Sequence, residues 1–236
     1  MTDSPQGTDS PQGMRCFKRL ESVTPTDSWF TDWQSQFYTE STKLPTTVLE
    51  SLGHLMPLLM CGEQSAALVF NREASRSENH RSAKLFSDIE ADEVIHDEAL
   101  QAIYADLPVS SQEAIIKQRA KRFYLAMGND STPTELFARI VHLDSCVCSI
   151  MSTVENSKLG DNHPYAHVFR RIKLDEARHV GVSRKHLKWL GSDSQRTSEL
   201  GKEIRTRFAE LIRPDADHWE ILGVDWDILE KKILRS

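Results

Sequence analysis

The chain has 236 residues, and its 29 Lys and Arg against 35 Asp and Glu give a net charge of −6 at neutral pH. This acidic balance gives no reason to expect nucleic acid or an anionic membrane as a partner. Hydrophobic residues make up 39 % and charged residues 27 %, which is typical of a folded globular chain long enough to bury a core.

Two further absences narrow the class of protein. No run of 18 apolar residues occurs, so no membrane-spanning helix is expected. The first 30 residues lack the basic start and the apolar stretch of a secretory signal. A reducing, cytoplasmic location is therefore the expectation.

The N-terminal segment and the cysteines carry no sign of structure of their own. Residues 2–7 and 8–13 repeat the hexapeptide TDSPQG, which has no apolar side chain, so residues 1–14 are predicted to be a disordered tail. Whether translation starts at Met1 or Met14 stays open. The four cysteines show no CxxC and no disulfide-framework spacing, and three are interpreted as small core residues: Cys61, Cys146 and Cys148.

Residues 28–236 show helical periodicity and no convincing alternating strand, which predicts one all-α domain. Gly53 and Pro57 predict a kink or a late start in the first of the long helices. Pro133 opens the fourth helix, and Gly191 ends the fifth. The expected helices cover residues 46–73, 79–105, 111–127, 133–156, 165–190 and 195–212.

Two pentapeptides of the form DExxH lie in the middle of two of these helices: Asp92-Glu93-Val94-Ile95-His96 and Asp175-Glu176-Ala177-Arg178-His179. A Glu and a His three residues apart share one helical face, so both side chains can reach one metal ion. Both pairs interrupt apolar stripes, where a purely structural helix would carry Leu. Because an unpaired buried carboxylate is costly, a cation is expected opposite them.

The geometry of antiparallel hairpins selects one more acid on each of two other helices, because residues at one height lie equidistant from the connecting loop. Glu63 and Glu93 have their midpoint at residue 78, inside a polar loop, and Asp144 and Glu176 have theirs at Gly160. Both added acids also interrupt apolar stripes. The predicted metal ligands are therefore Glu63, Glu93, His96, Asp144, Glu176 and His179.

Four carboxylates and two divalent ions balance in charge. Carboxylate and imidazole ligands without a thiolate favour two iron ions, and manganese in place of one iron stays open. Asp92 and Asp175 are predicted to accept the free ring N–H of a ligand histidine on a neighbouring helix. Glu90 is interpreted as a solvated charge, with a role as an extra ligand as the alternative.

This constellation resembles the ferritin-like superfamily of carboxylate-bridged di-iron proteins, which carry an acid, an ExxH, an acid and an ExxH on four successive helices. The resemblance covers about residues 45–191 and implies a ferritin-like four-helix bundle with additional N- and C-terminal helices. Most members carry Glu where this chain has Asp144, and the shorter arm implies a more open or more asymmetric iron. Family members activate O₂, oxidise or store iron, or generate radicals.

Within that family, an oxygenase or oxidase that uses O₂ on a small organic substrate, with an external electron donor, is the expected function. The segment DEARHVGVSR looks like the fourth-helix segment of the para-aminobenzoate N-oxygenase group. Ile172 stands where that group has an additional histidine, so N-oxygenation is one candidate among others.

Three other interpretations remain. A rubrerythrin- or ferritin-like protein for iron or peroxide is the first, although the chain has no CxxC…CxxC module. A ribonucleotide reductase small subunit is disfavoured, because Leu100 occupies the position of that family's radical tyrosine. The third, from another class, is a helical interaction protein without metal.

Some residues outside the predicted ligand set also received an interpretation. His142 is interpreted as structural, and His186, too far along its helix to share the metal of His179, as a surface or pocket-lining residue. A homodimer is a further expectation that stays open. The run of basic residues on the fifth helix is interpreted as a solvated face, or else as a docking surface for an acidic reductase or carrier: Arg170, Arg171, Lys173, Arg178, Arg184, Lys185 and Lys188.

Overall fold

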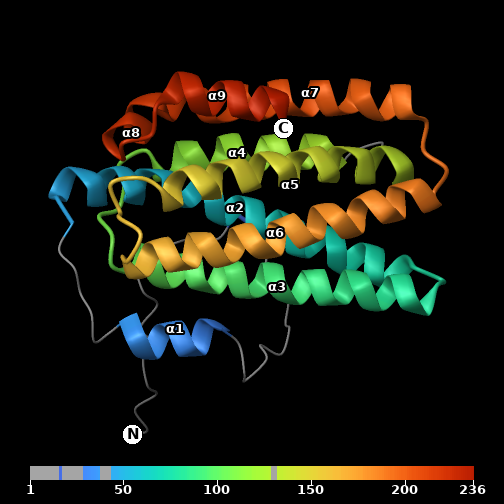
Figure 1. Cartoon of the computed structure of the whole chain (residues 1–236), viewed down its shortest axis with the longest axis horizontal. Coiled ribbons are helices and arrows are strands. Elements are labelled where there is room, and N and C mark those ends of the chain that lie inside the picture. Colours follow the sequence, from blue (N-terminus) through green and yellow to red (C-terminus); the bar gives the residue numbers. More distant parts are fainter. Residues whose placement is uncertain (1–15, 18–28, 38–43, 129–131) are drawn as a thin grey trace, which may run out of the picture.

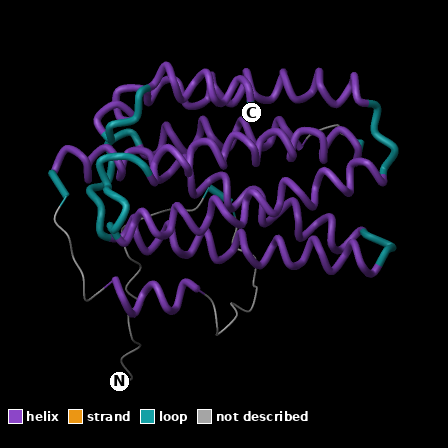
Figure 2. Tube along the Cα trace, viewed as in Figure 1, coloured by secondary structure: helices purple, strands orange, loops and turns teal. Residues whose placement is uncertain are grey.

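A computed structural model of the chain describes residues 16–17, 29–37, 44–128 and 132–236. Throughout these ranges the regular structure is helical, without a strand, which confirms the predicted all-α class (Figure 2). The predicted disordered tail, residues 1–14, lies outside the described residues.

Four long helices form the centre of the molecule (Figure 1). Helices α2 and α3 pack against each other as one hairpin, α5 and α6 as another, and α3 also contacts α6. Each of the eight helix ends lies within three residues of its prediction. The bounds are Thr46–Arg76 for α2, His80–Ala105 for α3, Pro133–Glu155 for α5 and Pro164–Trp189 for α6.

Local capping explains where these helices begin. The Asn79 side chain accepts hydrogen bonds from the first backbone N–H groups of α3, the nearer at 2.9 Å. Thr132 and Glu135 form a capping box at the start of α5, with Pro133 in its first turn. Gly191 follows the end of α6 with a φ of 72°, a left-handed conformation that favours glycine.

The glycine and proline in the first half of α2 do not delay its start. The helix begins at Thr46 and continues through Pro57, so the predicted late start is wrong. Gly53 serves a different purpose: a Cβ there would lie 2.2 Å from the carbonyl oxygen of Pro108. The absence of a side chain thus lets the loop after α3 pack against α2.

Shorter helices cover the long ones. Helix α4 (Glu113–Gly128) packs on α2, and α7 (Ser194–Ile212) packs on α5. The chain then turns through η1 (Arg213–Asp215) and α8 (Ala216–Ile221) into α9 (Trp226–Arg235), which contacts α5 and α7. Helix α1 (Trp29–Phe37) lies against α6, where the Trp33 ring N–H donates to the Pro164 carbonyl at 2.8 Å. Helix α1 and the helices from α7 onward are the expected additional N- and C-terminal helices, whereas α4 is the helix predicted at residues 111–127.

One of the long helices, α5, is long and apolar enough to cross a membrane by length and composition alone. More than half of its most apolar window is buried inside the protein, as in an ordinary core helix, so this is weak evidence for a membrane.

His142, on α5, has the predicted structural role: its Nδ1 accepts a hydrogen bond from Arg205 at 2.8 Å, which joins α5 to α7.

Cys16 and Cys61 form a disulfide, which corrects the expectation that the cysteines are unpaired and that Cys61 is simply a core residue. The bond fastens residues 16–17 to α2, and the Cys16 backbone N–H also donates to Gln64 at 3.1 Å. Cys146 and Cys148 are free, as predicted. Disulfides persist mainly in oxidising compartments, so this bond does not support the reducing, cytoplasmic location that was expected. That location stays a prediction.

The close approach at Gly53 can be tested with a matched pair of helix glycines. Gly53→Ala should destabilise the protein by about 1–3 kcal/mol, because a backbone carbonyl blocks the new methyl group. Gly181→Ala, in α6 with open space around it, should stabilise it by about 0.5–1 kcal/mol. Chemical denaturation measures both values, and equal effects of the two substitutions would contradict the packing at Gly53.

Candidate metal centre

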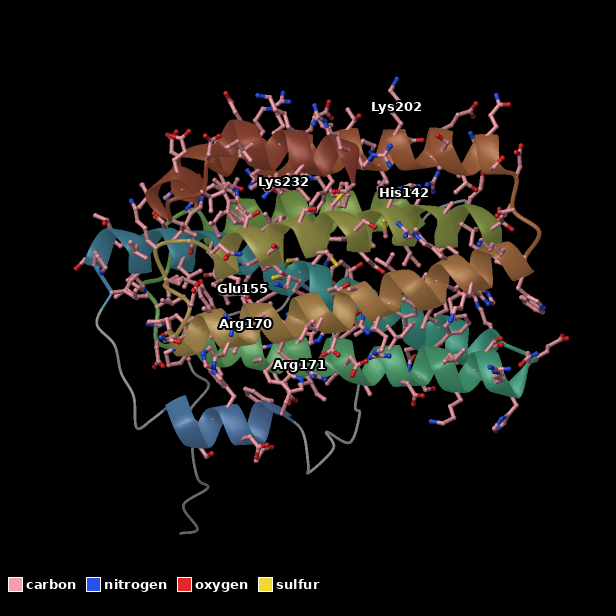
Figure 3. The ribbon with its side chains drawn as sticks, in the orientation of Figure 1. His142, Glu155, Arg170, Arg171, Lys202 and Lys232 are labelled. Carbon is pink, nitrogen blue, oxygen red and sulfur yellow. A yellow bond between two sulfur atoms is a disulfide. The ribbon has the colours of Figure 1, made fainter. Side chains whose placement is uncertain are left out.

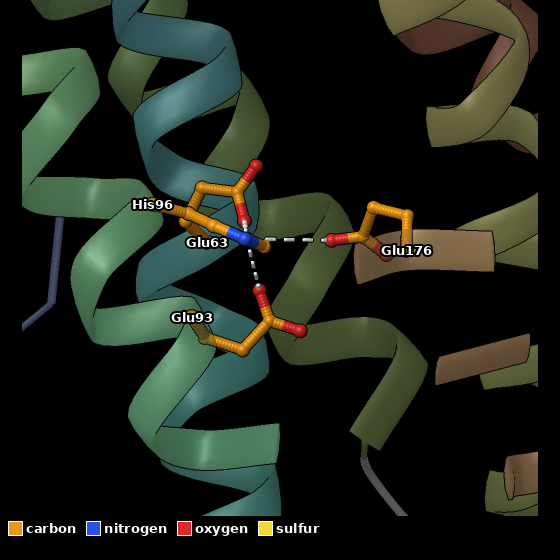
Figure 4. Close-up of side chains that lie close together, drawn as sticks. All are labelled: Glu63, Glu93, His96 and Glu176. Atoms are coloured by element: carbon orange, nitrogen blue, oxygen red, sulfur yellow. Dashed lines mark hydrogen bonds and ion pairs between the residues drawn. The ribbon is translucent and has the colours of Figure 1, made fainter. Parts of the chain in front are cut away.

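The two DExxH motifs face each other inside the molecule, one on α3 and one on α6. Donor atoms of four predicted ligands lie within 4.8 Å of one another, and all four side chains are buried (Figure 4). The four are Glu63 from α2, Glu93 and His96 from α3, and Glu176 from α6.

The His96 ring directs Nδ1 at three carboxylates. Its distances are 3.3 Å to Glu63 Oε2, 3.4 Å to Glu93 Oε2 and 3.7 Å to Glu176 Oε1. Ligand atoms that lie about 2.1 Å from a metal are roughly 3.0–3.4 Å apart at octahedral or tetrahedral angles. The spacing around His96 is therefore close to that of a coordination sphere.

The second histidine stands in the same relation to the same carboxylates. Nδ1 of His179 lies 3.1 Å from Glu93 Oε1 and 3.8 Å from Glu176 Oε2. Glu93 and Glu176 therefore each direct one oxygen at each histidine. A carboxylate in this position is able to bridge two ions. His179 is fully buried, although it lies outside the compact group of four.

The sixth predicted ligand, Asp144 on α5, is buried beside this group without belonging to it. The side chain of Asp is one methylene shorter than that of Glu, so its carboxylate reaches less far from α5, which agrees with its position at the margin of the group. Several buried polar atoms of the described residues lack a hydrogen-bond partner, and three of them belong to predicted ligands: Asp144 Oδ2, Glu93 Oε2 and His179 Nδ1. Because buried polar atoms are normally satisfied, these atoms fit a bound cation.

An aspartate on the opposite helix holds the outer nitrogen of each histidine. His96 Nε2 lies 3.4 Å from Asp175 Oδ2, and His179 Nε2 lies 3.2 Å from Asp92 Oδ2. The crossed contacts predicted for Asp92 and Asp175 are present. They favour the proton on Nε2 and leave the Nδ1 lone pair free to bind a metal. Glu90 lies outside the group of four, and its Oε1 accepts a hydrogen bond from Asn71 at 2.9 Å.

Several basic residues of α6 form ion pairs with acidic side chains, which residues of a purely solvated face would not need. Arg170 and Lys173 both pair with the buried Glu155 of α5, the former at 2.6 Å (Figure 3). Arg171 lies 3.1 Å from Asp175, and Arg178 pairs with Asp92. Four of the seven residues of this run therefore hold α6 in place or support the aspartates behind the histidines.

Burial and mutual repulsion decide the charge of the carboxylates. Burial raises the pKa of Glu63, Asp144 and Glu176, and neighbouring carboxylates raise it further. Burial also acts to raise the pKa of Glu93, but the two histidines outweigh it and hold that pKa below its usual range. Without a cation, the group is expected to keep protons that a metal would displace.

The histidines respond to the same charges in the opposite sense. Burial acts to lower the pKa of His96 and His179, but the facing carboxylates outweigh it and raise both. Burial also raises the pKa of the free thiol of Cys148, to about 12, so this side chain stays a neutral thiol beside the site. Carboxylates and imidazoles are thus the candidate metal donors.

A cavity of about 40 Å³ adjoins the carboxylates. It has room for a molecule of the size of dioxygen, since a water needs about 10–15 Å³ on this measure. Four acids line one side: Glu63, Glu93, Asp144 and Glu176. Apolar side chains from α2, α5 and α7 form most of the remainder: Leu58, Leu59, Ala66, Leu143, Val147, Ile150, Met151 and Phe208.

Sequence reasoning missed one polar residue of this cavity, Tyr124 on α4. Its hydroxyl packs so close to α2 that a Cβ on Gly62 would lie 2.9 Å from it. Burial, together with Glu63 and Glu176, raises the pKa of Tyr124, so the phenol remains a hydrogen-bond donor. The apolar stripe of α4, to which Tyr124 belongs, was the signal that could have identified this residue. The hairpin argument did not include it, because that argument pairs only α2 with α3 and α5 with α6.

Metal loading should release protons. Because Glu63, Asp144 and Glu176 have raised pKa values, a divalent ion must displace their protons, and its apparent affinity should rise with pH. A raised pKa also implies that the metal-free protein loses stability as the pH rises through it. An indicator dye in weak buffer measures the release, and thermal unfolding against pH measures the stability. Loading without proton release would contradict the assignment.

The aspartates behind the histidines should tune metal affinity without touching the metal. Asp175→Asn should weaken binding by about 10- to 100-fold, because the amide no longer accepts and orients the His96 N–H as a carboxylate does. Asp88→Asn, on the exposed face of α3, is the matched control and should leave affinity unchanged. Competition with a chelator of known affinity measures both. Equal affinities in the two variants would refute the role of Asp175.

Comparisons of the chain with protein-family models, with curated proteins and with solved structures gave no match. What the site can do therefore follows from its donor set. Buried carboxylates and imidazoles that face one another across metal-binding distances form a group that could hold a metal ion.

Proposed function

We propose that this protein is a non-haem di-iron oxygenase or oxidase with a ferritin-like four-helix arrangement, which activates O₂ to oxidise a small organic substrate. The observation that carries the proposal is the position of Glu93 and Glu176, each with one oxygen toward His96 and one toward His179. Two bridging carboxylates between two histidines imply two adjacent ions.

The donor set supports iron at both positions. Carboxylate and imidazole ligands suit iron or manganese better than a soft metal, and four carboxylates neutralise two divalent ions. Glu63 and His96 would hold one ion, and Asp144 and His179 the other, with Glu93 and Glu176 between them. Two ferrous ions at such a site supply the electrons and the open coordination positions that O₂ activation requires.

The lining of the cavity suits an apolar group of an organic substrate beside the acids. Its apolar wall excludes water from the carboxylates, which strengthens electrostatic interactions there. Apart from the four acids, Tyr124 supplies the polar side chain of this wall among the described residues. The part of a substrate that reaches the site would be apolar, with one polar atom for the phenol to bind.

The opposing interpretations predict different iron contents. Anaerobic reconstitution with Fe(II) should stop at two ions per chain, and exposure to O₂ should produce a new absorption band with uptake of O₂. Candidate amines, acids and aldehydes are then added to find the one that is oxidised. Uptake of many ions per chain would instead indicate an iron store, and uptake of none a helical interaction protein.

The ligand assignment is tested by substitution. Glu176→Ala and His96→Ala should each abolish stoichiometric iron and O₂ uptake, because each removes a donor of the group. Glu90→Gln, one turn from Glu93 and bonded to Asn71, is the matched control and should bind iron normally. Circular dichroism should show that the helices persist. Unchanged iron content in both ligand variants would count decisively against the site.

A further inference from the structure

The α2–α3 turn, the start of α5 and the end of α6 lie at the same end of the molecule (Figure 1). A groove is lined by residues of these three segments. It consists of two adjoining hollows of about 720 and 450 Å³. Asn79, Phe86, His186 and Trp189 line both hollows, which confirms the pocket-lining interpretation of His186. Each volume lies within the range of about 300–1,000 Å³ that small-molecule sites occupy.

The most exposed large apolar side chain of this groove is Trp189, with 67 % of its surface accessible. Its indole contacts the His186 ring, but most of its surface faces water. Its flat ring is available to stack against a planar ligand.

The groove is positively charged, although the whole chain carries −6. Arg76, Arg81 and Lys185 line it and have no ion-pair partner among the described residues. Glu78 is the acid that opposes them, since Glu73 pairs with Arg72 at 3.1 Å. The surplus of cations favours an anionic ligand.

A series of packed rings leads from this groove to the proposed metal centre. Ring centroids lie 5.3 Å apart between Trp189 and His186, 4.9 Å between His186 and Phe86, and 6.2 Å between Phe86 and Phe70. Phe70 then lies 6.5 Å from His179, a predicted ligand. Electron tunnelling weakens steeply with each gap, so a packed path of this kind couples the surface to the site.

We propose that the groove binds a reduced flavin mononucleotide and that electrons pass from it along these rings to the metal centre. The flavin ring would stack on Trp189, and its phosphate would lie among Arg76, Arg81 and Lys185. The flavin loses two electrons, which convert two ferric ions to two ferrous ions, and it leaves oxidised after releasing the hydrogens of its reduced ring as protons. This inference rests on the proposed di-iron function.

A free flavin fits the groove better than a protein partner does. Two hollows that share an exposed indole suit a small planar molecule, whereas a stable protein interface needs more than about 1,000 Å² of complementary surface. A protein that docks on the same cations is the alternative outcome of the test.

Binding is tested first on the metal-free protein, where it does not depend on the di-iron function. The fluorescence of added flavin mononucleotide should be quenched on binding, and Trp189→Leu should weaken binding about tenfold through lost stacking. Arg76→Glu should weaken it as well. Lys202→Glu, an exposed lysine on α7 remote from the groove, is the control (Figure 3). No binding by the natural chain, or equal affinities in all variants, would overturn the proposal.

Electron entry is tested on the iron-loaded ferric protein without O₂. Loss of the ferric absorption with saturating photoreduced flavin should be severalfold slower in Trp189→Leu and His186→Leu, while reduction by dithionite should proceed at the normal rate. Equal rates with flavin would refute the ring path. Reduction by an acidic redox protein alone would refute the flavin. A protein that binds flavin but no iron would refute the di-iron function and leave the binding result standing.

Discussion

The structure depends on the burial of four carboxylates between helices. Glu63, Glu93, Asp144 and Glu176 are all shielded from water, where an isolated negative charge is strongly disfavoured. Two histidines contribute at most two positive charges, so the group needs protons or metal cations to reach neutrality. This need explains why the pKa values of three of the acids are raised while that of Glu93, which lies against both histidines, is lowered. The helices place these groups where a cation could neutralise them.

The same constraint fixes the relative positions of α3 and α6. His96 on α3 is held by Asp175 on α6, and His179 on α6 is held by Asp92 on α3. A shift of one helix by a single turn, about 5.4 Å, would break both contacts at once. The arginines that pair with these aspartates, Arg171 and Arg178, extend the network to the surface. Packing and site geometry therefore depend on each other.

The sequence was enough to predict the features that follow from helical periodicity and from the symmetry of the two helical hairpins. The helix bounds, the Glu–His pairs and the crossed aspartates follow from the 3.6-residue repeat, and the position of Glu63 follows from hairpin geometry. Features that arise from contacts between distant segments were missed. The Cys16–Cys61 disulfide leaves no spacing signature, and Gly53 resembles a helix breaker although it serves packing. The donor set favours iron or manganese, but the substrate and the reaction depend on the shape of the cavity, which the spacing of side chains along the sequence does not determine.

The surroundings of the site differ on its two sides. Toward α4 and α7 it meets an apolar cavity with the phenol of Tyr124, and toward the end of α6 it meets the aromatic rings that lead to Trp189. If both carry the roles proposed for them, substrate and electrons approach from different directions. A substrate in the cavity then does not block the electron path, and a reductant in the groove does not displace the substrate. Separation of this kind would let a buried centre be reduced again without opening its water-excluding wall.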